Sequence, residues 1–203
     1  MKVLACFLGI LTVLSVGATD ILKMVGDKYD KIQTISADFS QEIKYSSNDR
    51  KSQFSGHLLI EKPDKMRMSV IEPDTQLMIS NVGSLWVYIK SAKQAMLYSL
   101  KRETYPQLGT LIFDVSKQFE SELVGKNKDR YVLRLIPRQK SHYYDSLYAK
   151  VSRRSYIITG LTVFDRQANR IDYTFSNIRT NVPVAKNQFT FVPPPGTAII
   201  KRQ

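Results

Sequence analysis

The sequence predicts a mainly β fold with a few helices, of the α+β class, built around one large curved antiparallel sheet. Most of the chain alternates apolar and polar residues in short runs that end at polar turns, as antiparallel strands with one wet face do. Only two segments show the apolar spacing of amphipathic helices. Because two helical segments cover little of so wide a sheet, we expect its inner face to border a cavity.

Residues 1–18 are interpreted as a cleaved secretory signal peptide. Lys2 precedes an apolar run over residues 3–16, and Ala18 ends a small-residue motif of the kind that precedes a cleavage site. The apolar run is short for a membrane span. We therefore expect an exported protein with a single domain over residues 19–203.

Cysteine content and net charge narrow the compartment and the partners that we expect for this protein. Cys6 precedes most of the apolar run, which argues against a lipid-modified cysteine, and the expected mature chain then has no disulfide and no thiol nucleophile. That composition suits a bacterial periplasm. The net charge of +12 favours an anionic partner such as lipid headgroups or an acidic protein, although ordinary solvation explains it equally well. The basic residues are densest at 150–155 and 199–203, and we expect no nucleic-acid partner because no binding motif is present.

The elements follow from local spacing. A helix is predicted over 20–33, where Ile21, Leu22, Val25, Tyr29 and Ile32 recur at helical spacing. Alternating segments then predict about ten or eleven strands, interrupted at 105–118 by one or two short helices. The last predicted strand is "NQFTF" (187–191), because the proline run that follows it cannot donate to a ladder.

One strand contains methionines where Val or Ile would pack more rigidly. In "IEKPDKMRM" (60–68), Pro63 ends one strand, and Met66 and Met68 share a face of the next. Methionine is unbranched and polarizable, so it adapts to variable partners. The pattern is compatible with gap filling in a core, and it also suits the wall of a binding cavity.

Catalytic signals are scarce. The two histidines, His57 and His142, show no metal-ligand spacing, and no nucleophile elbow or phosphate-binding glycine loop occurs. The sequence therefore predicts a protein that is not an enzyme and that uses no cofactor and no metal.

Five stretches, in this order, resemble the LolA family of periplasmic lipoprotein carriers over about residues 20–200. They are "ISADFSQ" (35–41), "GHLLIEKPDKMRM" (56–68), "EPDTQLMISNVGSLWVYIKSAKQA" (72–95), "FDRQANRIDYTFSNIRTN" (164–181) and "FTFVPPPGTAII" (189–200). Each stretch is weakly specific, and their order and spacing together carry the resemblance.

The resemblance implies an incomplete antiparallel β-barrel closed by a helical lid over a hydrophobic cavity. It implies a periplasmic chaperone that binds the acyl chains of lipoproteins and carries them from the inner to the outer membrane. Its partners would be acylated lipoproteins, an ATP-driven inner-membrane releasing complex, and an outer-membrane acceptor or the outer membrane itself, with the carrier a monomer. A carrier or sensor of another lipid, or of mislocalised lipoprotein, built on the same fold is the alternative.

Alternation does not decide which face of each strand is inside, and we expect Leu77 and Ile79 to point inward. We expect the cavity to be lined by Phe39, Phe54, Met66, Met68, Leu77, Ile79, Trp86, Tyr88, Met96 and Phe175, and the lid by Leu108, Leu111 and Ile112. Four positions depart from the family pattern. Met66 stands where the family often has an aromatic residue, and Met68 stands where it often has tryptophan. Lys62 stands where the family has an arginine that latches the lid, and Asn169 stands at a turn glycine, where it too would tolerate a positive φ.

Overall fold

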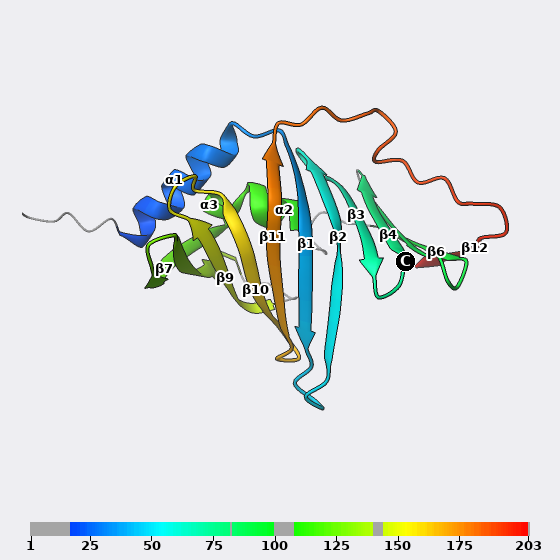
Figure 1. Cartoon of the computed structure of the whole chain (residues 1–203), viewed down its shortest axis with the longest axis horizontal. Coiled ribbons are helices and arrows are strands. Elements are labelled where there is room, and N and C mark those ends of the chain that lie inside the picture. Colours follow the sequence, from blue (N-terminus) through cyan, green and yellow to red (C-terminus); the bar gives the residue numbers. More distant parts are fainter. Residues whose placement is uncertain (1–16, 82, 100–107, 140–143, 203) are drawn as a thin grey trace, which may run out of the picture.

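The computed structural model describes residues 17–81, 83–99, 108–139 and 144–202, which form three helices and one open sheet of twelve strands (Figure 1). The helices are α1 (Ala18–Asp30), α2 (Leu108–Phe113) and α3 (Val115–Gln118). The strands are β1 (Thr34–Lys44), β2 (Lys51–Glu61), β3 (Lys65–Glu72), β4 (Gln76–Asn81), β5 (Ser84–Ile89), β6 (Gln94–Ser99), β7 (Phe119–Lys126), β8 (Arg130–Pro137), β9 (Tyr144–Ser152), β10 (Ile158–Asp165), β11 (Arg170–Thr180) and β12 (Ala198–Arg202).

The sheet consists of two antiparallel meanders joined at their long strands. Strands β1 to β6 pair in sequence order, as do β7 to β11, and β1 pairs with β11 to join the halves. The barrel does not close, because β12 and β7 lie at opposite ends of the strand order. The meander was predicted from local alternation, and the result confirms a mainly β, incomplete barrel.

The C-terminal segment differs from the prediction. Residues 187–190 form a turn, in which Thr190 N donates to Asn187 O (3.1 Å), so no strand forms at "NQFTF". The last strand is instead β12, which pairs with β6 in parallel and brings the total to twelve. Residues 181–197 form the crossover that leads the chain from β11 to β12 at one edge of the sheet.

That crossover runs over the outer face of the sheet. The Arg67 guanidinium on β3 donates to Gln188 O (3.2 Å). The Phe191 ring lies 5.1 Å from the Trp86 ring and 5.6 Å from the Tyr88 ring. Phe189 is buried in the same segment. The side chains of β3–β5 that point to this face are therefore covered by the chain's own C-terminal segment.

The three helices lie on the other face of the sheet, here called the helix face. Helix α1 starts two residues before the predicted helix and ends three residues before its predicted end, because the backbone N–H of Lys31 turns back to Lys28 O. Its apolar stripe is buried as the spacing predicted, together with Ile32 just beyond the helix. Helix α2 packs against β2 so closely that a Cβ on Gly109 would lie 2.9 Å from Ile60 Cγ2.

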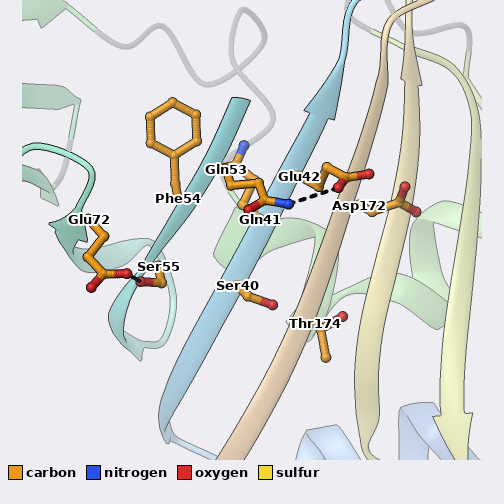
Figure 2. Close-up of a pocket in the computed structure, with 9 residues that line it drawn as sticks. All are labelled: Ser40, Gln41, Glu42, Gln53, Phe54, Ser55, Glu72, Asp172 and Thr174. Atoms are coloured by element: carbon orange, nitrogen blue, oxygen red, sulfur yellow. Dashed lines mark hydrogen bonds between the residues drawn. The ribbon is translucent and has the colours of Figure 1, made fainter. Parts of the chain in front are cut away.

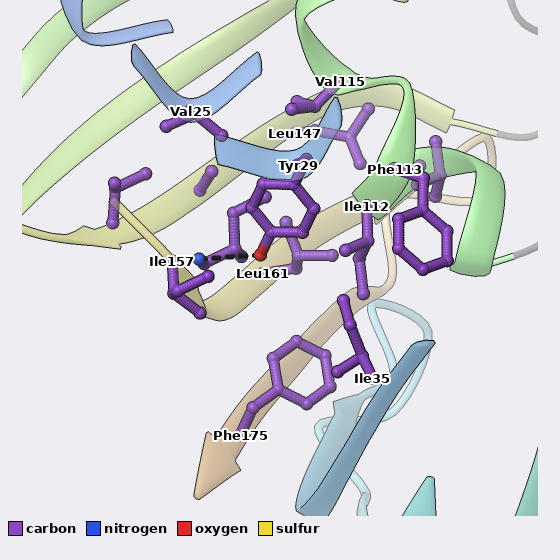
Figure 3. Close-up of a cluster of buried hydrophobic side chains, with 14 of the residues drawn as sticks. Val25, Tyr29, Ile35, Ile112, Phe113, Val115, Leu147, Ile157, Leu161 and Phe175 are labelled. Carbon is purple, nitrogen blue, oxygen red and sulfur yellow. Dashed lines mark hydrogen bonds between the residues drawn. The ribbon is translucent and has the colours of Figure 1, made fainter. Parts of the chain in front are cut away.

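Tyr29 connects α1 to the sheet inside the core (Figure 3). Its ring contacts Phe113 edge-to-face at 6.3 Å, and its hydroxyl accepts a hydrogen bond from Ile158 N (3.0 Å). Burial raises the pKa of the Tyr29 hydroxyl well above its ordinary value, so it remains protonated at all working pH values.

Replacing this tyrosine tests how firmly α1 is held. Tyr29→Phe leaves the buried Ile158 N–H without its acceptor and is expected to lower the free energy of unfolding by about 1 to 3 kcal/mol. Urea unfolding measures the change. Tyr88→Phe keeps its ring against Phe191 and is expected to cost less than about 0.5 kcal/mol. Equal losses in both variants would contradict the assigned role of Tyr29.

Candidate functional site

A continuous apolar row crosses seven strands on the helix face. Residues opposite one another in antiparallel strands point to the same face, so the pairing register defines the row. Met68 is opposite Met78, Met78 is opposite Val87, and Val87 is opposite Met96. The full row is Ala37, Leu58, Met68, Met78, Val87, Met96 and Ile200.

Burial falls along this row with distance from the helices. Met68 is 6% exposed and Met66, two residues before it, is 8% exposed, whereas Met78, Val87 and Met96 are only half-buried. In Figure 1 the helices lie over the half of the sheet that contains β7–β11, and β3–β6 form the other half. We call the helix-face side chains Met66, Met68, Met78, Val87 and Met96 the methionine wall.

The structure separates the ten predicted lining residues into two sets. Leu77 lies opposite Ser69 and Tyr88, and Ile79 lies opposite Arg67 and Trp86. Side chains alternate along a strand, so Leu77, Ile79, Trp86 and Tyr88 point to the outer face.

The expectation that these four share a cavity with Met66 and Met68 is therefore wrong. The Phe191 ring of the crossover packs against Trp86 and Tyr88, and Leu77 and Ile79 lie opposite these two residues on the same face.

The three phenylalanines of the predicted lining are on the helix face but differ in setting. Phe39 and Phe175 are directly opposite one another, and both are buried in the core that includes helix residues. Phe175 also stacks on Tyr173 with ring centroids 6.1 Å apart. Phe54 lies opposite Gln41 and is only half-buried. Only Met66, Met68 and Met96 of the ten lie in the methionine wall.

The predicted lid residues all lie on α2. Leu111 and Ile112 are buried in the core, and Leu108 is partly buried against it. Phe113 ends this helix and packs on Tyr29 of α1, so the two helices share one apolar contact. Residues 105–107 of the predicted helical segment lie outside the described residues.

Lys62 joins both helices to the sheet. It follows β2 immediately, and its ammonium donates to Tyr29 O near the C-terminal end of α1 (2.7 Å). The same ammonium lies 5.1 Å from the centroid of the Phe113 ring on α2, within reach of a cation–π interaction. A cation near the last carbonyls of a helix is also favourable toward the helix dipole. These contacts match a lysine that holds helices against the sheet.

The sequence model of the family described as "Outer membrane lipoprotein carrier protein LolA" matches residues 30–192. The chain belongs to the LolA family.

Two relatives agree with this membership, and one solved structure shares the fold. The chain is 30% identical over 177 residues to the outer-membrane lipoprotein carrier protein of Pseudomonas paraeruginosa, covering 85% of this chain and 83% of that protein. It is 26% identical over 189 residues to the one of Coxiella burnetii, covering 91% and 88%. An uncharacterized conserved protein from Thermus thermophilus, 11% identical, covers 91% of this chain and 99% of its own with a TM-score of 0.58, which shows a shared fold.

Asn169, one departure from the LolA pattern, has a different role from the one that the sequence predicted. The positive φ in the 165–169 turn belongs to Ala168 (60°), and Asn169 is not among the residues with positive φ. The Asn169 side chain instead donates to Asp165 Oδ2 (2.8 Å) and accepts from Ser46 N (3.0 Å). Asn169 therefore ties the β10–β11 turn to the β1–β2 turn, which glycine could not do.

A pocket of about 340 Å³, lined mostly by polar residues, lies beside residues 40–42 of β1 and 53–55 of β2 (Figure 2). It is lined by Ser40, Gln41, Glu42, Gln53, Phe54, Ser55, Glu72, Asp172 and Thr174. Gln53 donates to Glu42 (3.1 Å), and this hydrogen bond, followed by that from Lys44, holds the pKa of Glu42 below its ordinary value. Three carboxylates, Glu42, Glu72 and Asp172, line this pocket, and burying them under an acyl chain would cost free energy.

Another cluster that contains titratable side chains lies on the outer face. His57 Nδ1 contacts Asp38 Oδ1, and Asn177 donates to Asp38 Oδ2 (2.7 Å). The bond from Asn177, then the one with His57, lowers the pKa of Asp38 from its ordinary value. The described residues contain no group of three or more His, Cys, Asp or Glu side chains that could hold a metal ion, and His142 lies outside them. Across the same described ranges, no helix is both long and apolar enough to cross a membrane.

Proposed function

We propose that this LolA-family protein carries lipoproteins through the periplasm by burying their acyl chains against the methionine wall. The observation that supports this most directly is the apolar row across β3–β6, whose burial decreases away from the helices. The carrier names of the relatives from Pseudomonas and Coxiella support the same cargo class.

The free-energy cost of exposing an acyl chain to water requires an apolar surface on the carrier. Each methylene removed from water is worth about 0.8 kcal/mol, so one chain of roughly 16 carbons costs on the order of 12 kcal/mol when it is left in water. A carrier must also release its cargo, so its wall should not bind too tightly. The four methionines in the wall provide an apolar surface that repacks around different chains.

In this proposal α2 is the lid and Lys62 the latch. The Lys62 contacts with Tyr29 O and the Phe113 ring hold α1 and α2 on the sheet when the wall is unoccupied. Cargo that needs the space beneath α2 competes with these contacts. Because a lysine ammonium has no planar fork, it makes fewer simultaneous bonds than the family's arginine, and the latch opens more easily.

We infer the partners from the same membership. Cargo would arrive from an ATP-driven inner-membrane complex and leave to an outer-membrane acceptor or to the outer membrane itself, with the carrier acting as a monomer and performing no catalysis. Mass spectrometry of material that copurifies from periplasmic extract tests the cargo. Acylated peptides are the expected result. Free lipid would indicate a carrier of another lipid, and a consistently empty protein would contradict both.

Lys62 provides a direct test of the latch. Lys62→Ala removes contacts made only in the closed form and so is expected to tighten the apparent affinity for an acylated peptide about fivefold, through a population shift near 1 kcal/mol. Lys62→Arg keeps a cation at the latch, so its affinity for the acylated peptide is expected to be equal to or weaker than that of wild type. Fluorescence titration with a labelled lipopeptide measures both variants.

The control is Lys65→Ala, in the same hairpin but paired with Glu61 (2.6 Å) and close to the Phe189 ring (5.7 Å). Its affinity should equal that of wild type. An unchanged affinity in Lys62→Ala, or the same change in Lys65→Ala, would show that Lys62 is not a latch.

A further inference from the structure

Two adjacent hairpin turns at one end of the sheet bring five cationic side chains together. The β7–β8 hairpin contributes Lys126 and Arg130 at its strand ends and Lys128 in its turn, and the β9–β10 turn contributes Arg153 and Arg154. The turns are neighbours because Arg130 is opposite Ser152 in the ladder. All five side chains are exposed, and we call them the basic tip.

The backbone of the basic tip is held firmly. Arg153 N donates to Asp129 O (2.9 Å), and its guanidinium donates to Asn127 O (2.8 Å) while lying 5.1 Å from the Tyr131 ring. Asn127 Oδ1 accepts from the backbone N–H groups of Asp129 and Arg130 (2.9 Å each). These partners are neutral carbonyls and a ring, so the positive charge of Arg153 is not cancelled.

Charge pairing stops where the basic tip begins. Farther along the same β7–β8 hairpin, Arg134 pairs with Glu122 (3.2 Å) and Arg138 with Glu120 (2.8 Å). Within the described ranges, none of the five tip cations has a carboxylate within ion-pair distance. Asp129 is the one acidic residue in these two turns, so the local charge is strongly positive.

We propose that the basic tip docks the protein on a bilayer that contains anionic phospholipid. Long cationic side chains on projecting turns attract a negatively charged headgroup surface without needing a defined register. Val124, 52% exposed at the bulge between Leu123 and Gly125, adds an apolar side chain two residues from Lys126. A basic and apolar combination at a rigid tip fits the interface of headgroups and acyl chains better than an acidic protein patch, which would require matched positions.

Vesicle co-sedimentation of the full chain tests this surface without any cargo. Wild type is expected to bind phosphatidylcholine vesicles that contain phosphatidylglycerol more strongly than pure phosphatidylcholine vesicles. This difference should shrink as salt is raised, because the Debye length falls from about 30 Å at 0.01 M to about 10 Å at 0.1 M. Pure phosphatidylcholine vesicles provide the baseline for binding that does not depend on lipid charge.

Two double variants test which cationic side chains attract the protein to anionic vesicles. Lys128→Gln with Arg154→Gln is expected to weaken binding to the anionic vesicles roughly thirtyfold, at about fivefold for each cation near the surface. Lys90→Gln with Lys93→Gln removes the same charge from the exposed β5–β6 turn and should change little. Thermal unfolding confirms that each variant folds.

Three outcomes would overturn the proposal. Equal losses in both double variants would mean that net charge alone attracts the protein. Equal binding of wild type to both kinds of vesicle at low salt would exclude bilayer docking without using a variant. Lipid indifference combined with tip-dependent capture of an acidic protein would assign the surface to that protein instead.

Discussion

Replacing Met78 and Met96 together by serine is expected to weaken the binding of an acylated peptide by roughly thirty- to a hundred-and-fiftyfold. Each methionine would lose apolar contact with the acyl chain worth about 1 to 1.5 kcal/mol, since both are half-buried in the free protein. The fold should survive, because neither side chain is part of the buried core. Titration with a fluorescent lipopeptide measures the affinity, and urea unfolding measures the stability.

The matched control is Met24→Ser, which removes a methionine that is 39% exposed on α1. It should leave the affinity unchanged. If the double variant binds like wild type, the acyl chain does not lie on the methionine wall. If Met24→Ser weakens binding as much, the effect comes from general hydrophobicity and the assigned surface is wrong.

Gly56→Ala is expected to cause the largest loss of stability, about 3 kcal/mol or more. A Cβ at this position would overlap the backbone oxygen of Ser69 on the neighbouring strand, and backbone cannot rotate away as a side chain can. Phe39 is directly opposite Gly56 on β1, so movement to that side is restricted as well. The hairpin that would be disturbed also contains Met66 and Met68. Urea unfolding gives the free energy directly.

Gly125→Ala is the control, because no backbone atom lies close to the position of the added Cβ. A Cβ on Gly125 would lie 3.6 Å from Val132 Cβ, which is an ordinary van der Waals contact. Its stability should change by less than about 1 kcal/mol. A small effect of Gly56→Ala would mean that β2 and β3 can separate locally at their bulge without loss of the fold.

Local pattern accounts for the elements that the sequence predicted correctly. The apolar spacing from Ile21 to Tyr29 matches α1, and alternating runs separated by polar turns match the antiparallel hairpins. Pro63 lies in the turn between β2 and β3, as its missing N–H requires. These features depend on residues close together in the chain, so a single sequence contains the information.

Features that depend on distant segments were not predictable in this way. Trp86 and Tyr88 look as suitable for a cavity wall as Met66 and Met68, since alternation defines two faces and does not say which is inside. The answer depends on the pairing register with β3 and β4, and on Phe191, a hundred residues away, which covers the outer face. The crossover that places Phe191 there also makes β12 parallel to β6.

Hydrophobic period, turn chemistry and motif order are local properties, and they were sufficient to predict the fold class, most elements and the family of this protein. Two features depend on packing between distant segments: Met78, Val87 and Met96 continue the row that begins at Met68, and the Lys62 ammonium reaches both Tyr29 O and Phe113. The physical reason is that a strand's side chains alternate with period two. A binding face is therefore chosen by what packs on each side of the sheet.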